Sequence, residues 1–177
     1  LASSSTETIQ LVKPLIDNHF ITVRESTDVK GLEYASILKN IYAIAVGICH
    51  SLGYGDNFLA VLTSNAVREM KAFIDTACPS ARNPDSSGYL GDLLVTAFSQ
   101  FSRNRTFGTM IGKGYSIKSA LLELNMVPEG YFASQSFHNL QKHYPLAHMP
   151  VVKSVYQILY GKADPEREFK KLEKELV

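Results

Sequence analysis

Apolar residues recur every three to four positions along most of the chain, which is the period of a helix buried on one face. The first such stripe is Ile9, Val12 and Ile16, and Pro14 weakens the second half of the helix that it predicts. From Gly31 onward the pattern predicts helices only. We place them at 32–52, from 56, 91–99, from 102, from 116, 129–143, 150–161 and from 164.

One segment, residues 20–23 with the sequence Phe-Ile-Thr-Val, has the composition of a strand. A lone strand leaves its backbone groups unpaired, so it requires a sheet supplied from elsewhere. The sequence therefore predicts that residues 1–30 are the helix-and-strand tail of an α/β domain and that residues 31–177 form an all-α domain. The start of the chain lacks the regions of a signal peptide, so it does not predict one. It also lacks Met, so we expect a processed or truncated chain.

The charge balance narrows the classes of function. Eighteen Lys and Arg residues against 17 Asp and Glu residues give the 177-residue chain a formal net charge of +1. This is not the basic footprint of a nucleic-acid-binding protein or of a protein held on an acidic membrane surface. No run of about 18 apolar residues predicts a membrane span. Two cysteines make no disulfide framework and the histidines lack zinc-ligand spacing, so we expect a cytoplasmic protein without a metal site.

Lys39 is the one formally charged residue between Tyr34 and Gly55. A helix that is apolar on nearly all sides is a buried helix, and a buried ammonium group is costly unless it is paired or used. Burial generally lowers the pKa of an ammonium group, which suits a lysine to proton transfer near neutral pH. The alternative is a lysine whose stem lies along the helix while its ammonium reaches solvent.

Two further groups of residues carry candidate chemistry. Asp92 is the sole charge in the run 88–96, where it could cap a helix or pair with a buried lysine. Ser102, Arg103 and Asn104 stand at the predicted start of a helix, where free N–H groups and arginine suit an anion such as phosphate. An ordinary helix cap with solvated arginines is the alternative there.

These groups, in this order, resemble the C-terminal half of the bacterial type of NAD(P)-dependent glycerol-3-phosphate dehydrogenases. The resemblance extends from about residue 31 to 161. It rests on Gly31-Leu32-Glu33, Leu38-Lys39-Asn40, Gly55-Asp56-Asn57, Gly91-Asp92-Leu93, Ser102-Arg103-Asn104-Arg105, Val127-Pro128-Glu129-Gly130, Met149-Pro150 and Ile158-Leu159-Tyr160. It implies the multi-helix fold of a 6-phosphogluconate-dehydrogenase-like C-terminal domain, preceded by the last helix and strand of a nucleotide-binding domain.

The family reduces dihydroxyacetone phosphate to sn-glycerol 3-phosphate with NADH or NADPH, reversibly, for glycerophospholipid synthesis. By resemblance, Lys39 is the general acid–base residue at the C2 oxygen, and Asp92 binds the substrate and orients the lysine. The resemblance places three residues at the substrate phosphate: Ser102, Arg103 and Asn104. It places three at the cofactor: Arg103, Val127 and Glu129.

The chain departs from the complete family pattern. It has no Gly-x-Gly-x-x-Gly fingerprint, so NAD(H) or NADP(H) would bind mainly to a nucleotide-binding domain outside these residues. We therefore expect the fragment to be inactive alone, to work with its own N-terminal domain and to be compatible with a homodimer. Residues 77–88 are more polar than the family leads us to expect.

Two other functions remain open at this point. One is a related dehydrogenase of the ketopantoate or β-hydroxyacid type, whose substrates need no phosphate site. The other is a non-catalytic helical dimerisation module, which would have no need of Lys39, Asp92 and Arg103.

Overall fold

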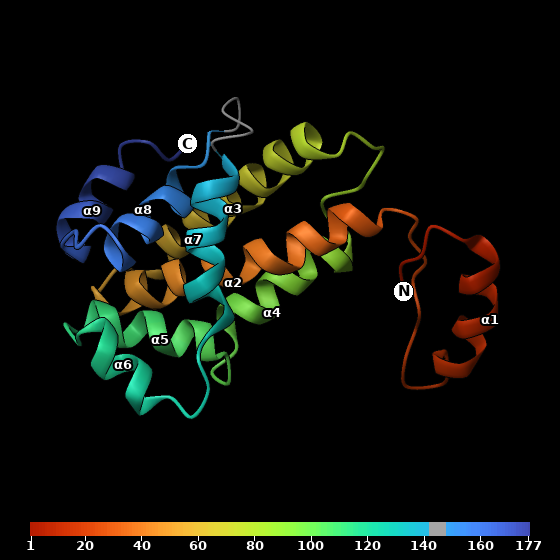
Figure 1. Ribbon diagram of the computed structural model, residues 1–177, viewed down its shortest axis with the longest axis horizontal. Coiled ribbons are helices and arrows are strands. Elements are labelled where there is room, and N and C mark those ends of the chain that lie inside the picture. Colours follow the sequence, from red (N-terminus) through yellow and green to blue (C-terminus); the bar gives the residue numbers. More distant parts are fainter. Residues whose placement is uncertain (142–147) are drawn as a thin grey trace.

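The computed structural model describes residues 1–141 and 148–177, and over these ranges the chain is helical, as predicted (Figure 1). The elements are α1 (Thr6–Ile16), α2 (Val29–Ser51), α3 (Asp56–Ala77), a short π-helical turn η1 (Ser87–Gly91), α4 (Asp92–Phe98), α5 (Arg103–Gly112), α6 (Ile117–Glu123), α7 (Glu129–Gln141), α8 (Pro150–Leu159) and α9 (Pro165–Leu172). The predicted boundaries agree closely with these. The predicted helix end at 143 lies outside the described residues.

Helix α2 is the centre of the fold, and α3, α4, α5, α7 and α8 all pack against it (Figure 1). From Leu38 to Cys49 nearly every side chain is buried, because this segment is apolar on all sides. By length and composition alone α2 could cross a membrane. However, 67% of its most apolar window is buried inside the structure, which is the environment of a core helix.

Two glycines bring α2 and α5 into backbone contact. A Cβ atom built on Gly47 would lie 2.1 Å from the carbonyl oxygen of Arg105, and one built on Gly108 would lie 2.1 Å from that of Ile44. Any larger residue at either position would push the helices apart. The glycine pair therefore fixes the position of α5 on α2.

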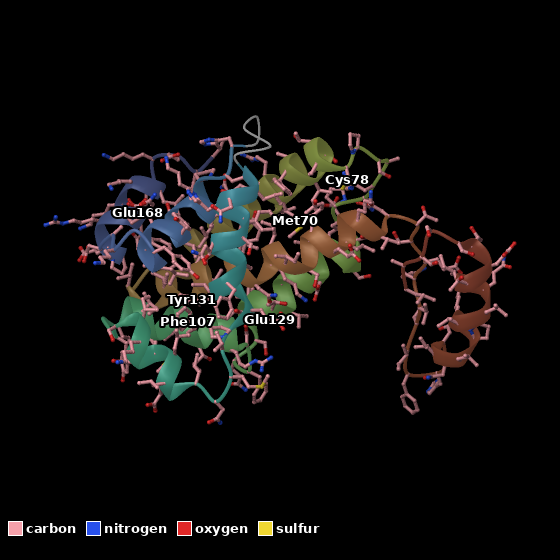
Figure 2. The ribbon with its side chains drawn as sticks, viewed as in Figure 1. Met70, Cys78, Phe107, Glu129, Tyr131 and Glu168 are labelled. Atoms are coloured by element: carbon pink, nitrogen blue, oxygen red, sulfur yellow. The ribbon has the colours of Figure 1, made fainter. Side chains whose placement is uncertain are left out.

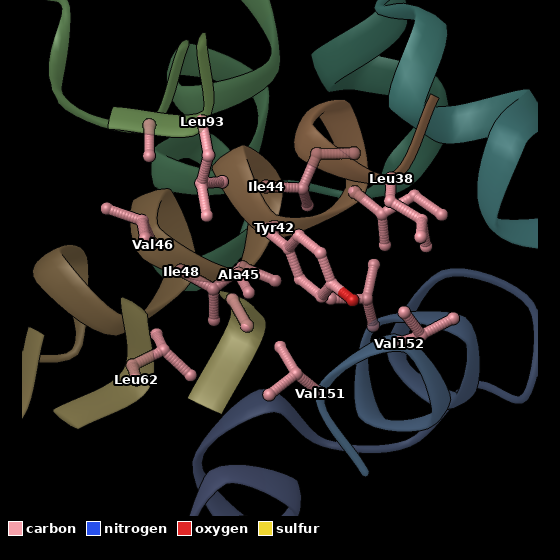
Figure 3. Close-up of a cluster of buried hydrophobic side chains, with 14 of the residues drawn as sticks. Leu38, Tyr42, Ile44, Ala45, Val46, Ile48, Leu62, Leu93, Val151 and Val152 are labelled. Atoms are coloured by element: carbon pink, nitrogen blue, oxygen red, sulfur yellow. The ribbon is translucent and has the colours of Figure 1, made fainter. Parts of the chain in front are cut away.

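An apolar cluster joins α2 to the helices on its other sides (Figure 3). Tyr42 lies in the middle of it, with Leu93 of α4, Leu62 of α3, and Val151 and Val152 of α8 around it. Each of these side chains is at most 1% exposed. Burial of one such side chain contributes about 1.5–3 kcal/mol, so this cluster is a major source of stability for the body.

The residues before α2 stand apart from the helical body (Figure 1). Helix α1 forms as predicted, but the strand predicted at 20–23 is wrong: these residues form no strand, and Phe20 is 91% exposed. Within residues 1–141 and 148–177, no strand lies beside them to pair their backbone groups. The Asn18 side chain instead accepts hydrogen bonds from the N–H groups of Phe20 and Ile21, and the sheet-like contact in the described part of the chain is one isolated bridge between Ala2 and Ser26.

Candidate active site

Lys39 and Asp92 form an ion pair between α2 and α4. The lysine Nζ lies 2.7 Å from Oδ1 and 2.6 Å from Oδ2 of the aspartate. The side chains are 19% and 37% exposed, so the pair is neither sealed in the core nor free in solvent. Of the two alternatives for Lys39, the structure shows the paired lysine.

The local sequence on both helices aims these two side chains at one another. Leu38 and Leu93, the direct neighbours of Lys39 and Asp92, are each 0% exposed and anchor α2 and α4 in the core. Asp92 is the first residue of α4, and both of its carboxylate oxygens accept a hydrogen bond from Lys39. The carboxylate therefore serves Lys39 and does not serve as a helix cap.

A chain of amide hydrogen bonds joins three helices next to this ion pair. Asn104 of α5 donates to the side-chain oxygen of Asn40 at 2.9 Å, and its own oxygen accepts from the N–H of Gly130 at 2.9 Å. Asn40 in turn donates to Glu129 at the start of α7 at 3.0 Å (Figure 2 labels Glu129). Because Asn40 follows Lys39 directly, this network holds the turn of α2 that carries the lysine.

Gly130 allows α7 to approach α2 closely enough for this network. A Cβ atom on Gly130 would lie 2.5 Å from the carbonyl oxygen of Asn40. The short contact explains why a glycine stands directly after Glu129, and it fixes α7 against the same turn of α2.

A polar hollow of about 260 Å³ opens beside the network. Its walls come from α2, α4, α5, the loop before α5 and the start of α7, and they are Asn40, Val95, Thr96, Ser99, Phe101, Ser102, Arg103, Asn104 and Glu129. The first turn of α5 faces this space, so the positive end of that helix does so too. The hollow therefore suits a small anionic group.

Ser102 and Arg103 occupy the mouth of the hollow in different ways. The Ser102 hydroxyl accepts a hydrogen bond from the N–H of Arg105 at 3.3 Å, so it caps α5. This agrees with the alternative of an ordinary helix cap for this residue. The Arg103 side chain is exposed, and its Nη1 donates to the Met126 sulfur at 2.8 Å. Arg103 thus lies between the hollow and the segment that carries Val127.

The structure gathers the seven residues singled out from the sequence in one region, but not in one cavity. Four of them line the hollow: Ser102, Arg103, Asn104 and Glu129. Lys39 directly precedes Asn40, and Asp92 lies one helical turn before Thr96, so both adjoin residues that line the hollow. Val127 is 44% exposed and lies just before α7.

Sequence reasoning missed part of the wall. Thr96 and Ser99 line the hollow, and so do the apolar residues Val95 and Phe101, of which Phe101 is 85% exposed. The spacing of four residues from Asp92 to Thr96 is the signal that could have found the threonine. Within the described residues there is no group of three or more His, Cys, Asp or Glu side chains that could hold a metal ion.

Known proteins are similar to this chain in sequence and in fold. Residues 28–170 match the family model described as "NAD-dependent glycerol-3-phosphate dehydrogenase C-terminus". The glycerol-3-phosphate dehydrogenase [NAD(P)+] of Staphylococcus saprophyticus is 35% identical over 160 residues, which are 90% of this chain and 48% of that protein. That of an Exiguobacterium strain is 37% identical over 175 residues, 97% of this chain and 50% of that protein.

A solved structure extends the likeness to the fold. The crystal structure of glycerol-3-phosphate dehydrogenase from Coxiella burnetii superposes with a TM-score of 0.88 at 30% sequence identity, over 97% of this chain and 52% of that one. This chain spans about half the length of the curated relatives that it matches. It belongs to the family of the NAD-dependent glycerol-3-phosphate dehydrogenases and matches their C-terminal domain.

Proposed function

We propose that this chain forms the substrate side of an active site that reduces dihydroxyacetone phosphate to sn-glycerol 3-phosphate, reversibly, with NADH or NADPH. The observation that carries the proposal is the Lys39–Asp92 ion pair beside a polar hollow at the start of α5. Proton chemistry and anion binding are thereby neighbours, as a phosphorylated ketone requires.

Lys39 acts in this proposal as the general acid. It donates a proton to the C2 oxygen while hydride arrives at C2, and it accepts a proton from the C2 hydroxyl in the reverse direction. Asp92 holds the ammonium group in place through two hydrogen bonds and contributes to substrate binding. Asn40 and Asn104 keep the lysine-bearing turn of α2 fixed relative to α5.

The phosphate end of the substrate lies in the hollow. The start of α5 favours an anion through its dipole and backbone N–H groups, and Arg103 adds charge-assisted hydrogen bonds to phosphate oxygens. Asn104 and the Ser102 cap shape the wall. A substrate without phosphate would leave this region unused, which disfavours a dehydrogenase of the ketopantoate or β-hydroxyacid type. A non-catalytic dimerisation module would have no need of the Lys39–Asp92 pair.

The residues present fit one edge of a nicotinamide cofactor. The exposed Arg103 and the 44%-exposed Val127 offer a cation and an apolar surface at the rim of the hollow, and the exposed Glu129 offers hydrogen-bond acceptors. NAD(P)H, when bound, supplies the hydride. The phosphates of the dinucleotide require a glycine-rich turn that these residues do not contain, so we assign most of its binding to a separate nucleotide-binding domain.

Residues 1–30 are, in this proposal, the end of that nucleotide-binding domain, and residues 31–177 are the substrate domain. The exposed apolar side chains of the first segment, Leu11, Leu15 and Phe20, support this division because they call for a covering partner. The complete protein would work in the cytoplasm, with its own nucleotide-binding domain and as a homodimer.

The experiment uses the full-length protein and follows NADH and NADPH absorbance after addition of dihydroxyacetone phosphate, with the present 177-residue fragment measured in parallel. We expect the full-length protein to oxidise one or both cofactors and the fragment to oxidise neither. A full-length protein that is folded but inert toward dihydroxyacetone phosphate would contradict the proposed reaction. Activity of the pure fragment would contradict the division of the site between two domains.

A further inference from the structure

The polar stretch 77–88, which runs from the end of α3 into η1, contains a buried cation outside the site described above. The side chain of Arg82 is only 2% exposed. Its Nε donates to Asp28 Oδ2 at 2.7 Å, while its other nitrogens donate to the Asp75 carboxylate and, at 2.6 Å, to the carbonyl oxygen of Cys78. One guanidinium thus ties the end of α3 to the start of α2.

Asp28 passes this restraint on to η1. One of its oxygens accepts from the N–H of Gly31 at 3.1 Å, which makes Asp28 the cap of α2. The other accepts from the hydroxyl of Tyr89, a residue of η1 that is 5% exposed. Arg82 and Tyr89 therefore share one carboxylate oxygen on α2.

The turn η1 leads directly into Asp92. The backbone N–H of Asp92 donates to the carbonyl oxygens of Ser87 and Tyr89, so the aspartate begins α4 from a closed turn. A Cβ atom on Gly88 would lie 2.6 Å from a methyl carbon of Leu32, so the turn also lies tightly on α2. Helix α2 thus holds this segment at two places, Asp28 and Lys39.

We propose that Arg82 is a positioning residue for the Lys39–Asp92 pair, acting through Asp28 and Tyr89. Arginine is suited to this task because its planar fork reaches three acceptors at fixed angles, which a lysine ammonium does not reproduce. The charges around Arg82 are balanced: two cations, Arg82 and Lys71, pair with two carboxylates, Asp28 and Asp75. The inference rests on the proposed function for its effect on catalysis, but not for the geometry that it claims.

The test compares Arg82→Met, Tyr89→Phe and Asp92→Asn in the full-length protein. The matched control is Lys71→Met, because Lys71 pairs with the same Asp75 without reaching Asp28. The first readout is the rate at which Lys39 is reductively methylated, followed by peptide mass spectrometry. A carboxylate that accepts two hydrogen bonds shields an ammonium from the reagent, so Asp92→Asn should raise this rate about fivefold.

We expect Arg82→Met and Tyr89→Phe to raise the Lys39 methylation rate toward that of Asp92→Asn, and Lys71→Met to leave it unchanged. Tyr89→Phe removes a single hydroxyl, so it decides the question even where Arg82→Met does not fold. Wild-type methylation of Lys39 in both variants overturns the inference. A Lys39 methylation rate in Asp92→Asn equal to that of the wild type also overturns it, because the ion pair would then not limit the reactivity of Lys39.

The second readout is kcat for dihydroxyacetone phosphate. Displacement of a catalytic group by about 1 Å costs on the order of a hundredfold, so Arg82→Met should lower kcat by roughly tenfold to a hundredfold. In an Asp92→Asn background the same change should cost less than about twofold, because Arg82 acts through Asp92. A full loss in that background overturns the inference. An inert wild-type protein overturns only the proposed function, since methylation still decides the positioning.

Discussion

The carboxylate of Glu69, on α3, accepts a hydrogen bond from the backbone N–H of Val151 at the first turn of α8, with an N–O distance of 2.6 Å. The N–H of Val152 points at the other oxygen at 3.4 Å, and Glu69 is 4% exposed. Helix α8 has no side-chain cap of its own. A buried acid from another helix therefore satisfies its first free N–H groups.

This arrangement predicts a pH-dependent stability. Burial raises the pKa of Glu69 from an ordinary 4.5 to about 8, although the hydrogen bonds from Val151, Val152 and Tyr42 oppose the shift. Between these values the folded protein holds a proton that the unfolded chain releases. The free energy of unfolding should therefore decrease as the pH rises through this window, by up to about 1.4 kcal/mol per pH unit from this group.

Urea denaturation at several pH values within this window measures the effect, with Glu69→Gln as the comparison. The glutamine cannot titrate, so the difference in unfolding free energy between the two proteins should change with pH. An identical pH slope in both proteins would exclude Glu69 as the titrating group.

Replacement of Lys39 tests the proposed acid–base role. Lys39→Ala in the full-length enzyme should lower kcat by about 10²–10⁴, the usual contribution of a general acid–base group, with a modest change in KM. Lys118→Ala is the control, because Lys118 is an exposed lysine of α6. A loss of less than about tenfold would rule the role out.

Arg103 should act on binding of the phosphate. Arg103→Ala should raise KM for dihydroxyacetone phosphate by roughly tenfold or more, the loss expected for a charge-assisted hydrogen bond. It should also reduce the preference over unphosphorylated dihydroxyacetone. Arg68→Ala, at an exposed position of α3, should change neither. Unaltered KM and preference in Arg103→Ala would remove the phosphate assignment.

The contact between α2 and α5 should be intolerant of a single methyl group. Gly108→Ala forces a Cβ atom against the backbone of Ile44 and should lower the unfolding free energy by about 1–3 kcal/mol or more. Gly55→Ala is the matched control, because the space around Gly55 is open and its φ of −78° suits alanine. Thermal melts of the two variants measure the difference, and equal melting temperatures would contradict a close contact.

The helices could be predicted from the sequence because their signal is local. The apolar stripe of α8 and the cap residues Ser102, Ser116 and Asp164 lie within a few positions of the helices that they define. Lys39 and Asp92 could be singled out for a similar reason, since each is a lone charge in an apolar run. The prediction of a strand at 20–23 was wrong because a strand depends on a partner strand that the local sequence does not specify.

The remaining features depend on contacts between distant residues. Arg82 looks like a solvated loop residue in the sequence, and its burial follows only from the approach of Asp28, which is 54 positions away. Glu69 likewise has the appearance of an exposed helix residue until α8 packs on it. The Asn40–Asn104 contact joins two uncharged amides 64 positions apart, and nothing in the sequence pattern indicates that these two side chains meet.

The glycine contact at Gly47 and Gly108 also sets a distance within the proposed site. It fixes the spacing of two helices, one of which carries Lys39 and the other Arg103. With the proposed roles, these residues hold the reacting carbonyl and the phosphate of one small substrate, so the spacing sets how many bonds may separate the two groups. The preference for a substrate of a given length would then depend on two glycines that have no side chain and do not contact the substrate.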